Sequence, residues 1–332
     1  IPATLKMKTC SDLLTDSKNY LDIRKKVLST YSFYHYKQII REFNEYFSKS
    51  TLKDVSAINE MEITSFIRTI TGKTSTVINK LIALRKFINY LNSIGYKIFV
   101  PELPENHDDY VPYIFSDDEI SEILEYLDNL PLEKGMNPLL QYEMPMIIRI
   151  MISSGTRISA TLHIKLGDFD PQMHTIIIRK GKNYKERIVP LNFSVSKMLI
   201  KYIDAMNISN PESYIFPNAL NDNEPMKYKS VANKFHNVLL KLNIYDHSGY
   251  KTRGPCLHCL RHYFVINSLR KLIAEGIPID NYIPYLSIYL GHDSLDETEK
   301  YLKFSPDIFT DEVELFSESI LDILPEVEND ED

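Results

Sequence analysis

A C-terminal stretch of the chain holds the side chains with the clearest chemistry. Residues 258–262 read HCLRH, and about thirty residues further on Leu290-Gly291-His292 is followed, nine positions after the histidine, by Tyr301. Imidazole, guanidinium and phenol groups at this spacing suit the cleavage of a phosphodiester by a tyrosine, because cations can gather around the phosphate while the phenolic oxygen attacks the phosphorus. The stretch therefore predicts a nucleophilic site for a phosphate diester.

Two upstream segments extend this pattern. Residues 151–162 read MISSGTRISATL, similar to a T-G-x-R-I-S-E-L box, and residues 179–191 read RKGKNYKERIVPL, similar to a G-K-G-x-K-x-R-x-V-P-L hairpin. Together with H-x-x-R-H and L-G-H-x8-Y, they resemble the tyrosine recombinases, the lambda-integrase family, over residues 115–305. The resemblance implies six catalytic residues: Arg157, Lys182, His258, Arg261, His292 and Tyr301.

The implied roles begin with charge stabilisation. A phosphodiester in reaction gathers negative charge on its non-bridging oxygens, and fixed donors aimed there are usually the largest catalytic contribution. Arg157 and Arg261 are implied to form this clamp, since guanidinium offers planar, bidentate and permanently charged donors. His292 is implied to donate to the same phosphate.

Proton transfer supplies the remaining roles. Tyr301 is the implied nucleophile, and because a tyrosine with an ordinary pKa of ~10 is protonated at neutral pH, it needs a base, for which His258 is implied. Lys182, on a hairpin tip, is implied to protonate the departing 5′ oxygen, although Lys180 and Lys185 on the same turn compete for that role. We expect no metal and no cofactor, because the cations of the protein neutralise the phosphate.

Two features of these boxes allow other interpretations. Cys256, His258, Cys259 and His262 include a C-x-x-C spacing, which is typical of zinc ligands. The sequence has no second pair of ligands to complete such a site, so we predict no metal there, and we expect His262 to be a structural, hydrogen-bonding residue. Ala160 stands where the family usually has an acidic residue that braces the first arginine. Asp168 matches another acidic position of the family and is a candidate to help.

The expected reaction is site-specific recombination through a 3′-phosphotyrosyl intermediate, in an integrase or transposase of a mobile element. A type IB topoisomerase would use the same chemistry and only relax DNA. A non-catalytic DNA-binding regulator is the alternative outside enzymes, and the six filled positions argue against it. The expected partners are double-stranded DNA and further copies of the chain, as a tetramer on paired sites.

Net charge at first argues against binding to DNA. The chain has a formal charge of −7, but residues 1–100 hold 16 Lys/Arg against 8 Asp/Glu, and residues 150–305 hold 20 against 14. The acidic residues gather in 101–149 and 306–332. Neutralisation of phosphates depends on local basic surface, so the two basic blocks are the expected DNA-binding parts.

The N-terminal hundred residues have the periodicity of helices. Apolar residues recur every three or four positions in Tyr31–Tyr46, Ala57–Ile70 and Thr74–Leu91, which predicts amphipathic helices. Resemblance and position together identify this part as the family's core-binding domain. Basic residues around the last of these helices are candidates for contact with DNA: Lys73, Lys80, Arg85 and Lys86.

Downstream, local signals set the other elements. Prolines and acidic residues between Lys97 and Phe115 indicate a linker. Ser116 and Glu119 form the ends of a capping box that begins a helix. Runs of β-branched residues, Thr175–Arg179 and Glu186–Leu191, flank a polar turn and predict a hairpin. In Thr310–Leu324 apolar residues recur among acidic ones, which predicts an amphipathic helix.

The predicted fold is mainly α with a small β-sheet, a helical N-terminal domain followed by a mixed α/β catalytic domain. Residues 1–98 are the expected helical, SAM-like core-binding domain, 99–115 the linker, 116–306 the catalytic domain, 307–324 a C-terminal helix for protomer contact and 325–332 an acidic disordered tail. The longest apolar run, Met144–Ile152, is broken by Arg149 and is too short to span a membrane. Without a charged-then-apolar leader, a cytoplasmic location is the expectation.

Overall fold

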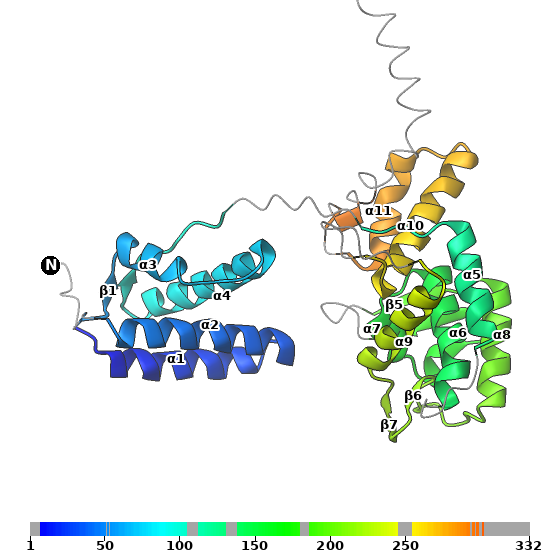
Figure 1. Ribbon diagram of the computed structural model, residues 1–332, viewed down its shortest axis with the longest axis horizontal. Helices are drawn as coiled ribbons and strands as arrows, with labels where there is room; N and C mark the ends of the chain where they lie inside the picture. The colour runs from blue at the N-terminus through cyan, green and yellow to red at the C-terminus, as the bar shows by residue number, and fades with distance from the viewer. Residues whose placement is uncertain are drawn as a thin grey trace, which may run out of the picture. The chain divides into compact units, whose positions relative to one another are not determined.

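The computed structural model divides into two compact units, Ile1–Asp109 and Tyr110–Asp332, shown as ribbons in Figure 1. It describes residues 7–50, 52, 54–104, 112–130, 138–179, 186–244, 254–292, 294, 295, 297, 298 and 301. The division between the units lies within the expected linker, residues 99–115.

The first unit is a helical bundle with an aromatic core. Its helices are α1 (Cys10–Lys25), α2 (Thr30–Ser48), α3 (Glu60–Ile67) and α4 (Thr74–Ser93). Phe43 on α2 packs edge-on against both Phe66 on α3 and Phe87 on α4, with ring centroids 5.4 and 5.7 Å apart. These three rings are almost fully buried, so one aromatic cluster joins three helices.

One predicted helix of this unit is shorter than expected. The sequence favoured a helix over Ala57–Ile70, but α3 begins only at Glu60, because Asn59 caps it and exchanges hydrogen bonds with Glu62 in a capping box. The two residues before the cap, β1 (Ala57–Ile58), pair instead in parallel with β2 (Lys97–Ile98). This pairing fixes the end of the unit next to α3.

The second unit surrounds the buried helix α6 (Pro138–Ser154). α6 packs against α5 (Asp117–Asp128), α8 (Phe193–Ala205) and α10 (Leu257–Ala274). The remaining helices are α7 (Ile158–Leu162), α9 (Tyr228–Lys241), α11 (Ile279–Leu290) and the 3₁₀ turn η1 (Leu166–Asp168). Helices therefore supply most of the core of this unit.

Small sheets complete the second unit. An antiparallel sheet joins β3 (Phe169–Asp170), β4 (Thr175–Ile178) and β5 (Arg187–Pro190), and a separate pair joins β6 (Pro217–Asn218) and β7 (Asn221–Pro225). β4 and β5 form the predicted hairpin, with Ile178 opposite Arg187. The mainly helical fold with small sheets is confirmed.

Three predictions fall outside the described residues: the position of Lys182, which belongs to the hairpin turn 180–185, the C-terminal helix 307–324 and the tail 325–332. In the described part of the chain, no helix combines the length and the apolar character that crossing a membrane requires.

Candidate active site

Arg261 lies at the centre of the site. The helix α10 turns it toward the core, where it is only 1% exposed. One terminal nitrogen donates to the Gly155 carbonyl at 2.7 Å, and the other lies 2.9 Å from both the Leu290 carbonyl and Nε2 of His292. A single guanidinium thus holds together the end of α6, the end of α11 and the helix that carries it.

Burial and the neighbouring Tyr301 shift the pKa of Arg261 in opposite directions. Desolvation is the largest effect and lowers the pKa of Arg261 to about 10, while the nearby Tyr301 raises that pKa. The guanidinium therefore stays charged at neutral pH, and the tyrosine side chain lies directly beside it.

Arg157 reaches the same place from a sharp turn. Gly155 ends α6 with a positive φ of 60°, and a Cβ at this position would meet the Phe264 ring at 2.3 Å. Only glycine fits this turn without displacing the ring. Two residues later Arg157, at the N-cap of α7, is 3.5 Å from the Gly291 carbonyl and 4.0 Å from the Glu297 carboxylate. The turn places a second guanidinium next to the first.

His292 follows the left-handed Gly291, which ends α11 with φ 65°. Its Nδ1 is 2.7 Å from the Thr298 hydroxyl, and its Nε2 faces the Arg261 donor. Because arginine can only donate, Nε2 accepts, which assigns the proton of a neutral ring to Nδ1. These two contacts, one at each ring nitrogen, fix the orientation of the His292 ring in the site.

Tyr301 is 5% exposed and packs between two histidines. Its ring is parallel to His292 with centroids 6.1 Å apart, and it lies 5.1 Å from the His262 ring. These ring contacts place the phenol among the imidazoles and near the Arg261 guanidinium, on whose pKa it acts.

His258 and His262 differ in their surroundings. The exposed His258 has its ring centroid 4.7 Å from that of the buried His262. Desolvation and the charges of Arg261 and Arg157 lower the pKa of His258 to about 4, so it is neutral at pH 7 and able to accept a proton. Desolvation and His258 lower the pKa of His262 to about 3.

The hydrogen-bonding role expected for His262 has no counterpart among the described residues and stays a prediction. Its Nδ1 is buried and makes no hydrogen bond to any residue that the structure describes. The residue instead fills space between His258 and Tyr301, a packing role that the sequence pattern alone did not indicate.

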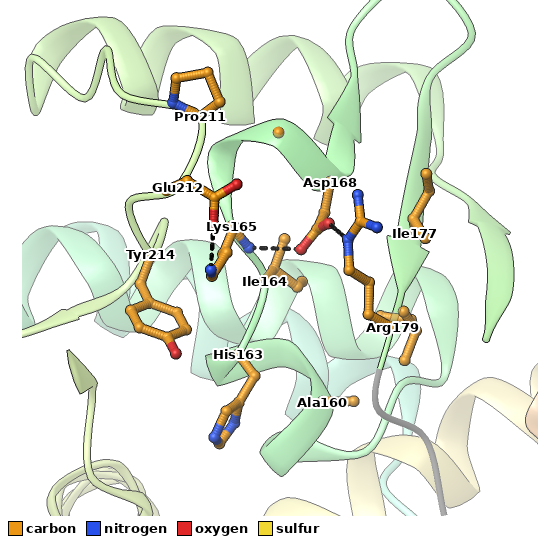
Figure 2. A pocket seen from close by; sticks show the side chains of 12 residues that line it. Ala160, His163, Ile164, Lys165, Asp168, Ile177, Arg179, Pro211, Glu212 and Tyr214 are labelled. Atoms are coloured by element: carbon orange, nitrogen blue, oxygen red, sulfur yellow. Dashed lines mark hydrogen bonds and ion pairs between the residues drawn. The ribbon is translucent and has the colours of Figure 1, made fainter. Parts of the chain in front are cut away.

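Asp168 does not brace Arg157. Figure 2 shows its carboxylate accepting a hydrogen bond from the Lys165 backbone (3.0 Å) and pairing with Arg179, while Ala160 lines the same pocket of about 470 Å³ without reaching either group. Arg179 follows β4 directly, so the buried Asp168 fixes the start of the hairpin turn. Among the described residues, the carboxylate that pairs with Arg157 is that of Glu297, which the family motif did not indicate.

The candidate metal ligands do not assemble into a site. The two sulfur atoms of Cys256 and Cys259 lie 3.6 Å apart. Across the described residues, no three histidine, cysteine or acidic side chains are grouped so that they could hold a metal ion.

The four candidate DNA-contacting residues of the first unit have different surroundings. Lys80 pairs with Glu42 at 3.1 Å, and Arg85 donates to the Pro101 carbonyl, so both have partners within the unit. Lys73 and Lys86 are exposed. All four remain predictions.

The structure also brings in Arg187, which was not predicted for the site. It begins β5, and its charge acts on both Arg157 and Arg261. The alternation of β5 could have indicated it: Arg187 shares a strand face with the buried Val189, where an apolar residue is usual.

Two family models match the chain. The model described as "Phage integrase family" matches residues 114–306, and that described as "Phage integrase, N-terminal SAM-like domain" matches residues 18–95. The chain belongs to the phage integrase family. It is a tyrosine recombinase by descent, as its motifs predicted.

Individual relatives of this recombinase are distant. A putative integrase/recombinase of Sinorhizobium fredii is 27% identical over 204 residues, which cover 59% of this chain and 63% of the relative, a little under two thirds of its length. The tyrosine recombinase XerA of Pyrococcus horikoshii is 23% identical, over 88% of this chain and 89% of that protein.

Solved structures share the fold at low identity. XerH in a post-cleavage complex with a palindromic difH substrate superposes with a TM-score of 0.65 at 20% identity, covering 88% of this chain and 80% of that one. A lambda integrase tetramer bound to a Holliday junction gives 0.63 at 13%, covering 89% and 78%. The Tn1549 transposon integrase gives 0.57 at 14%, covering 89% and 95%. The two-part fold of this recombinase is thus that of its family.

Proposed function

We propose that this recombinase cuts and rejoins DNA strands at specific sites through a 3′-phosphotyrosyl intermediate on Tyr301. The observation that carries the proposal is the grouping of Tyr301 with His292, on which it stacks, and with Arg261, which lies 2.9 Å from His292, while Arg157 contacts the neighbouring Gly291 carbonyl. A phenol among fixed cations is arranged to attack a phosphate that those cations bind.

In the proposed reaction the Tyr301 oxygen forms a bond to phosphorus, and the bond from phosphorus to the 5′ oxygen breaks. The tyrosine proton passes to His258, which is neutral at pH 7. The departing 5′ oxygen takes a proton from Lys182. The phosphotyrosyl bond conserves the energy of the diester, so a 5′ hydroxyl of a second strand reseals it without a nucleotide cofactor.

Charge is stabilised by the arginines and His292. Arg261 has five N–H donors, of which three point to Gly155, Leu290 and His292. The carbonyl contacts fix its plane, and a bound phosphate would replace its contact with His292. For His292 to donate to that phosphate, its Nε2 must then carry a proton. Pre-set donors of this kind cost no reorganisation when charge develops.

The proposed partners are duplex DNA and other copies of the chain. Residues 1–98 and 116–306 would each contact DNA through their basic surface, with Lys73 and Lys86 as the accessible candidates in the first unit. By analogy with the lambda integrase tetramer, four copies would assemble on paired sites. We place the enzyme in the cytoplasm, with a mobile element as its substrate, in keeping with its likeness to a transposon integrase.

Trapping a covalent adduct tests the proposal. The full chain is incubated with a pool of duplexes of random sequence, each nicked near its centre so that the short cleaved strand diffuses away. Adducts are isolated, their DNA is sequenced and the modified peptide is mapped. We expect one enriched sequence, Tyr301 as the linked residue, and no adduct from Tyr301→Phe, which binds the same DNA.

Each other outcome names an alternative. Linkage at Tyr263 or Tyr289 would show that the motif assignment is wrong. Sequence-specific binding without any adduct would indicate a regulator. Adducts without strand exchange, accompanied by relaxation of supercoiled DNA, would indicate a topoisomerase.

A further inference from the structure

Arg187 occupies a position in β5 that is usually apolar. Opposite Ile178, it lies on the same face of the strand as Val189, which is 1% exposed, while Ile188 between them is 65% exposed. Successive residues of a strand point to opposite faces, so the Arg187 side chain points inward. A charged group is rarely placed there without a partner.

Its guanidinium ends at the left-handed turn that follows α11. A Cβ added to Gly291 would meet one terminal nitrogen of Arg187 at 2.6 Å. Two residues close to Gly291 in the sequence connect this position to Arg261. His292 lies 2.9 Å from the Arg261 guanidinium, and the charge of Arg261 acts on Tyr289. The hairpin thus places the guanidinium of Arg187, in addition to those of Arg157 and Arg261, at the turn that precedes His292.

Among the residues that the structure describes, no carboxylate pairs with this third guanidinium. Nε of Arg187 is buried without a hydrogen-bond partner, and the described residues offer the side chain neither a hydrogen bond nor an ion pair. Burial and the charge of Arg157 lower the pKa of Arg187, and the charge of Arg187 in turn lowers that of Arg261. Three like charges converge, and within the described residues the one carboxylate paired with any of them is Glu297, at 4.0 Å from Arg157.

We propose that Arg187 is a further catalytic residue that binds a non-bridging oxygen of the scissile phosphate together with Arg157 and Arg261. The inference rests on the proposed function of the site. A buried cation without a partner is unfavourable, and so is repulsion between like charges. An anion from outside the protein removes both penalties, and a planar guanidinium matches the geometry of a phosphodiester.

The position of Arg187 adds a consequence for the hairpin. Lys182, the expected general acid, precedes Arg187 by five residues in the sequence of the hairpin. A phosphate contact of Arg187 would therefore come from the strand next to the turn in which Lys182 is expected.

A neutral phosphate analogue tests the inference. The adduct-trapping assay supplies a cleavable site, and this site is then made with either a normal diester or a methylphosphonate at the scissile position, which removes one charged oxygen. Single-turnover cleavage is measured for the full-length protein and for Arg187→Ala. With the diester we expect a loss of about 100-fold, in the range for one lost oxyanion donor. On the methylphosphonate diastereomer that lacks the contacted oxygen, the two proteins should cleave at similar rates.

The control is Arg270→Ala, which removes an exposed arginine from α10 and should match the parent protein on both substrates. An equal loss for Arg187→Ala on the diester and on both methylphosphonate diastereomers would overturn the phosphate contact while leaving the Tyr301 site intact. If the parent protein forms no adduct at all, the proposed function fails and this inference fails with it.

Thermal unfolding without DNA separates this role from a structural one. Arg187→Met keeps the length of the aliphatic stem and removes the charge. If the guanidinium is there for the substrate, the melting temperature of Arg187→Met should equal or exceed that of the parent, because repulsion with Arg157 and Arg261 is relieved. A melting temperature several degrees lower would assign Arg187 to the structure instead.

Discussion

At the scale of single residues, the two arginines predicted from the motifs are held in different ways. Arg261 is buried and donates to two backbone carbonyls on separate segments, Gly155 and Leu290. Arg157 is partly exposed, with a long contact to Gly291 and a loose one to Glu297. Arg261 therefore organises the site in addition to its proposed role in binding substrate, while the proposed role of Arg157 is binding substrate alone.

This difference predicts separate outcomes for Arg157→Lys and Arg261→Lys. Both should lose about 2 to 4 kcal/mol of transition-state stabilisation, since an ammonium cannot reproduce the bidentate fork. Only Arg261→Lys should also lower the free energy of unfolding, by about 1 to 3 kcal/mol, because buried carbonyls lose their donors. Single-turnover cleavage and denaturant unfolding measure the two effects. Equal stability of the two variants would contradict the organising role of Arg261.

At the scale of elements, an ion pair between the buried Asp168 and the half-exposed Arg179 joins η1 to the residue that follows β4 (Figure 2). Lys182 follows three residues later in the sequence. If Lys182 is the general acid, Lys182→Ala should cleave a normal diester poorly and regain most of its rate on a 5′-bridging phosphorothiolate, because a thiolate leaves without a proton. If the phosphorothiolate does not restore cleavage, Lys182 is not the general acid, and Lys180 and Lys185 become the candidates for that role.

The 5′-bridging phosphorothiolate also tests whether the ion pair between Asp168 and Arg179 positions the turn. Asp168→Asn weakens the contact with Arg179 and should misplace the turn, so its cleavage of the diester should fall and be partly restored by the phosphorothiolate. Glu212→Gln is a suitable control, because it removes an exposed ion pair with Lys165 in the same pocket without touching Asp168. A cleavage defect in Asp168→Asn that sulfur does not relieve would mean that the pair serves stability alone.

The helix α6 carries a titratable group inside the core. Both oxygens of Glu143 are buried and have no hydrogen-bond partner among the residues that the structure describes, and desolvation raises the pKa of Glu143 to about 8 from an ordinary 4.5. The unfolded chain releases this proton near pH 4.5 and the folded chain only near pH 8. The contribution of Glu143 to the free energy of unfolding should therefore be largest below pH 4.5. Between pH 4.5 and pH 8 it should fall by about 1.4 kcal/mol per pH unit.

Replacing Glu143 with glutamine removes this titration. Compared with the parent protein, Glu143→Gln should gain relative stability as the pH rises from 5 to 8, as measured by denaturant unfolding at several pH values. A constant difference between the two proteins across this range would show that Glu143 keeps an ordinary pKa in the folded chain.

At the scale of the whole molecule, charge is distributed by segment. The two basic blocks lie in the two units, and 306–332 holds 11 acidic and no basic residues. DNA would repel such an acidic segment, so the apolar residues of 310–324 are expected to bury against protein. We favour a neighbouring protomer as that protein, and packing within the same chain is the alternative.

Deleting residues 308–332 tests this assembly role. The truncated protein should bind a single half-site as the full chain does, but lose cooperative filling of paired half-sites and recombine poorly. Band-shift titrations on one and two half-sites, followed by a recombination assay, measure each step. Cooperative binding and normal recombination by the truncated protein would show that the segment packs against its own chain and has no role in assembly.

Local signals in the sequence determined much of this protein. Helices such as α2 and α4 follow from apolar periodicity, the start of α5 from its capping box, and the hairpin from two β-branched runs around a polar turn. Five of the six motif residues meet in one place, because motif spacing reflects a fold that the family shares. These features depend on short-range preferences or on whole boxes, both of which are readable along the chain.

Contacts between distant segments were decided only by the tertiary structure. The partner of Asp168 is Arg179 and not Arg157, Glu297 lies beside Arg157 where Ala160 has no carboxylate, and Arg187 points to Gly291, more than a hundred residues away. Helix and strand propensities act over a few residues, whereas the partner of a charged side chain depends on which segments pack together. The sequence therefore determined which groups are available for catalysis, and the packing of α10, α11 and the hairpin decided which of them lie close together in the proposed site.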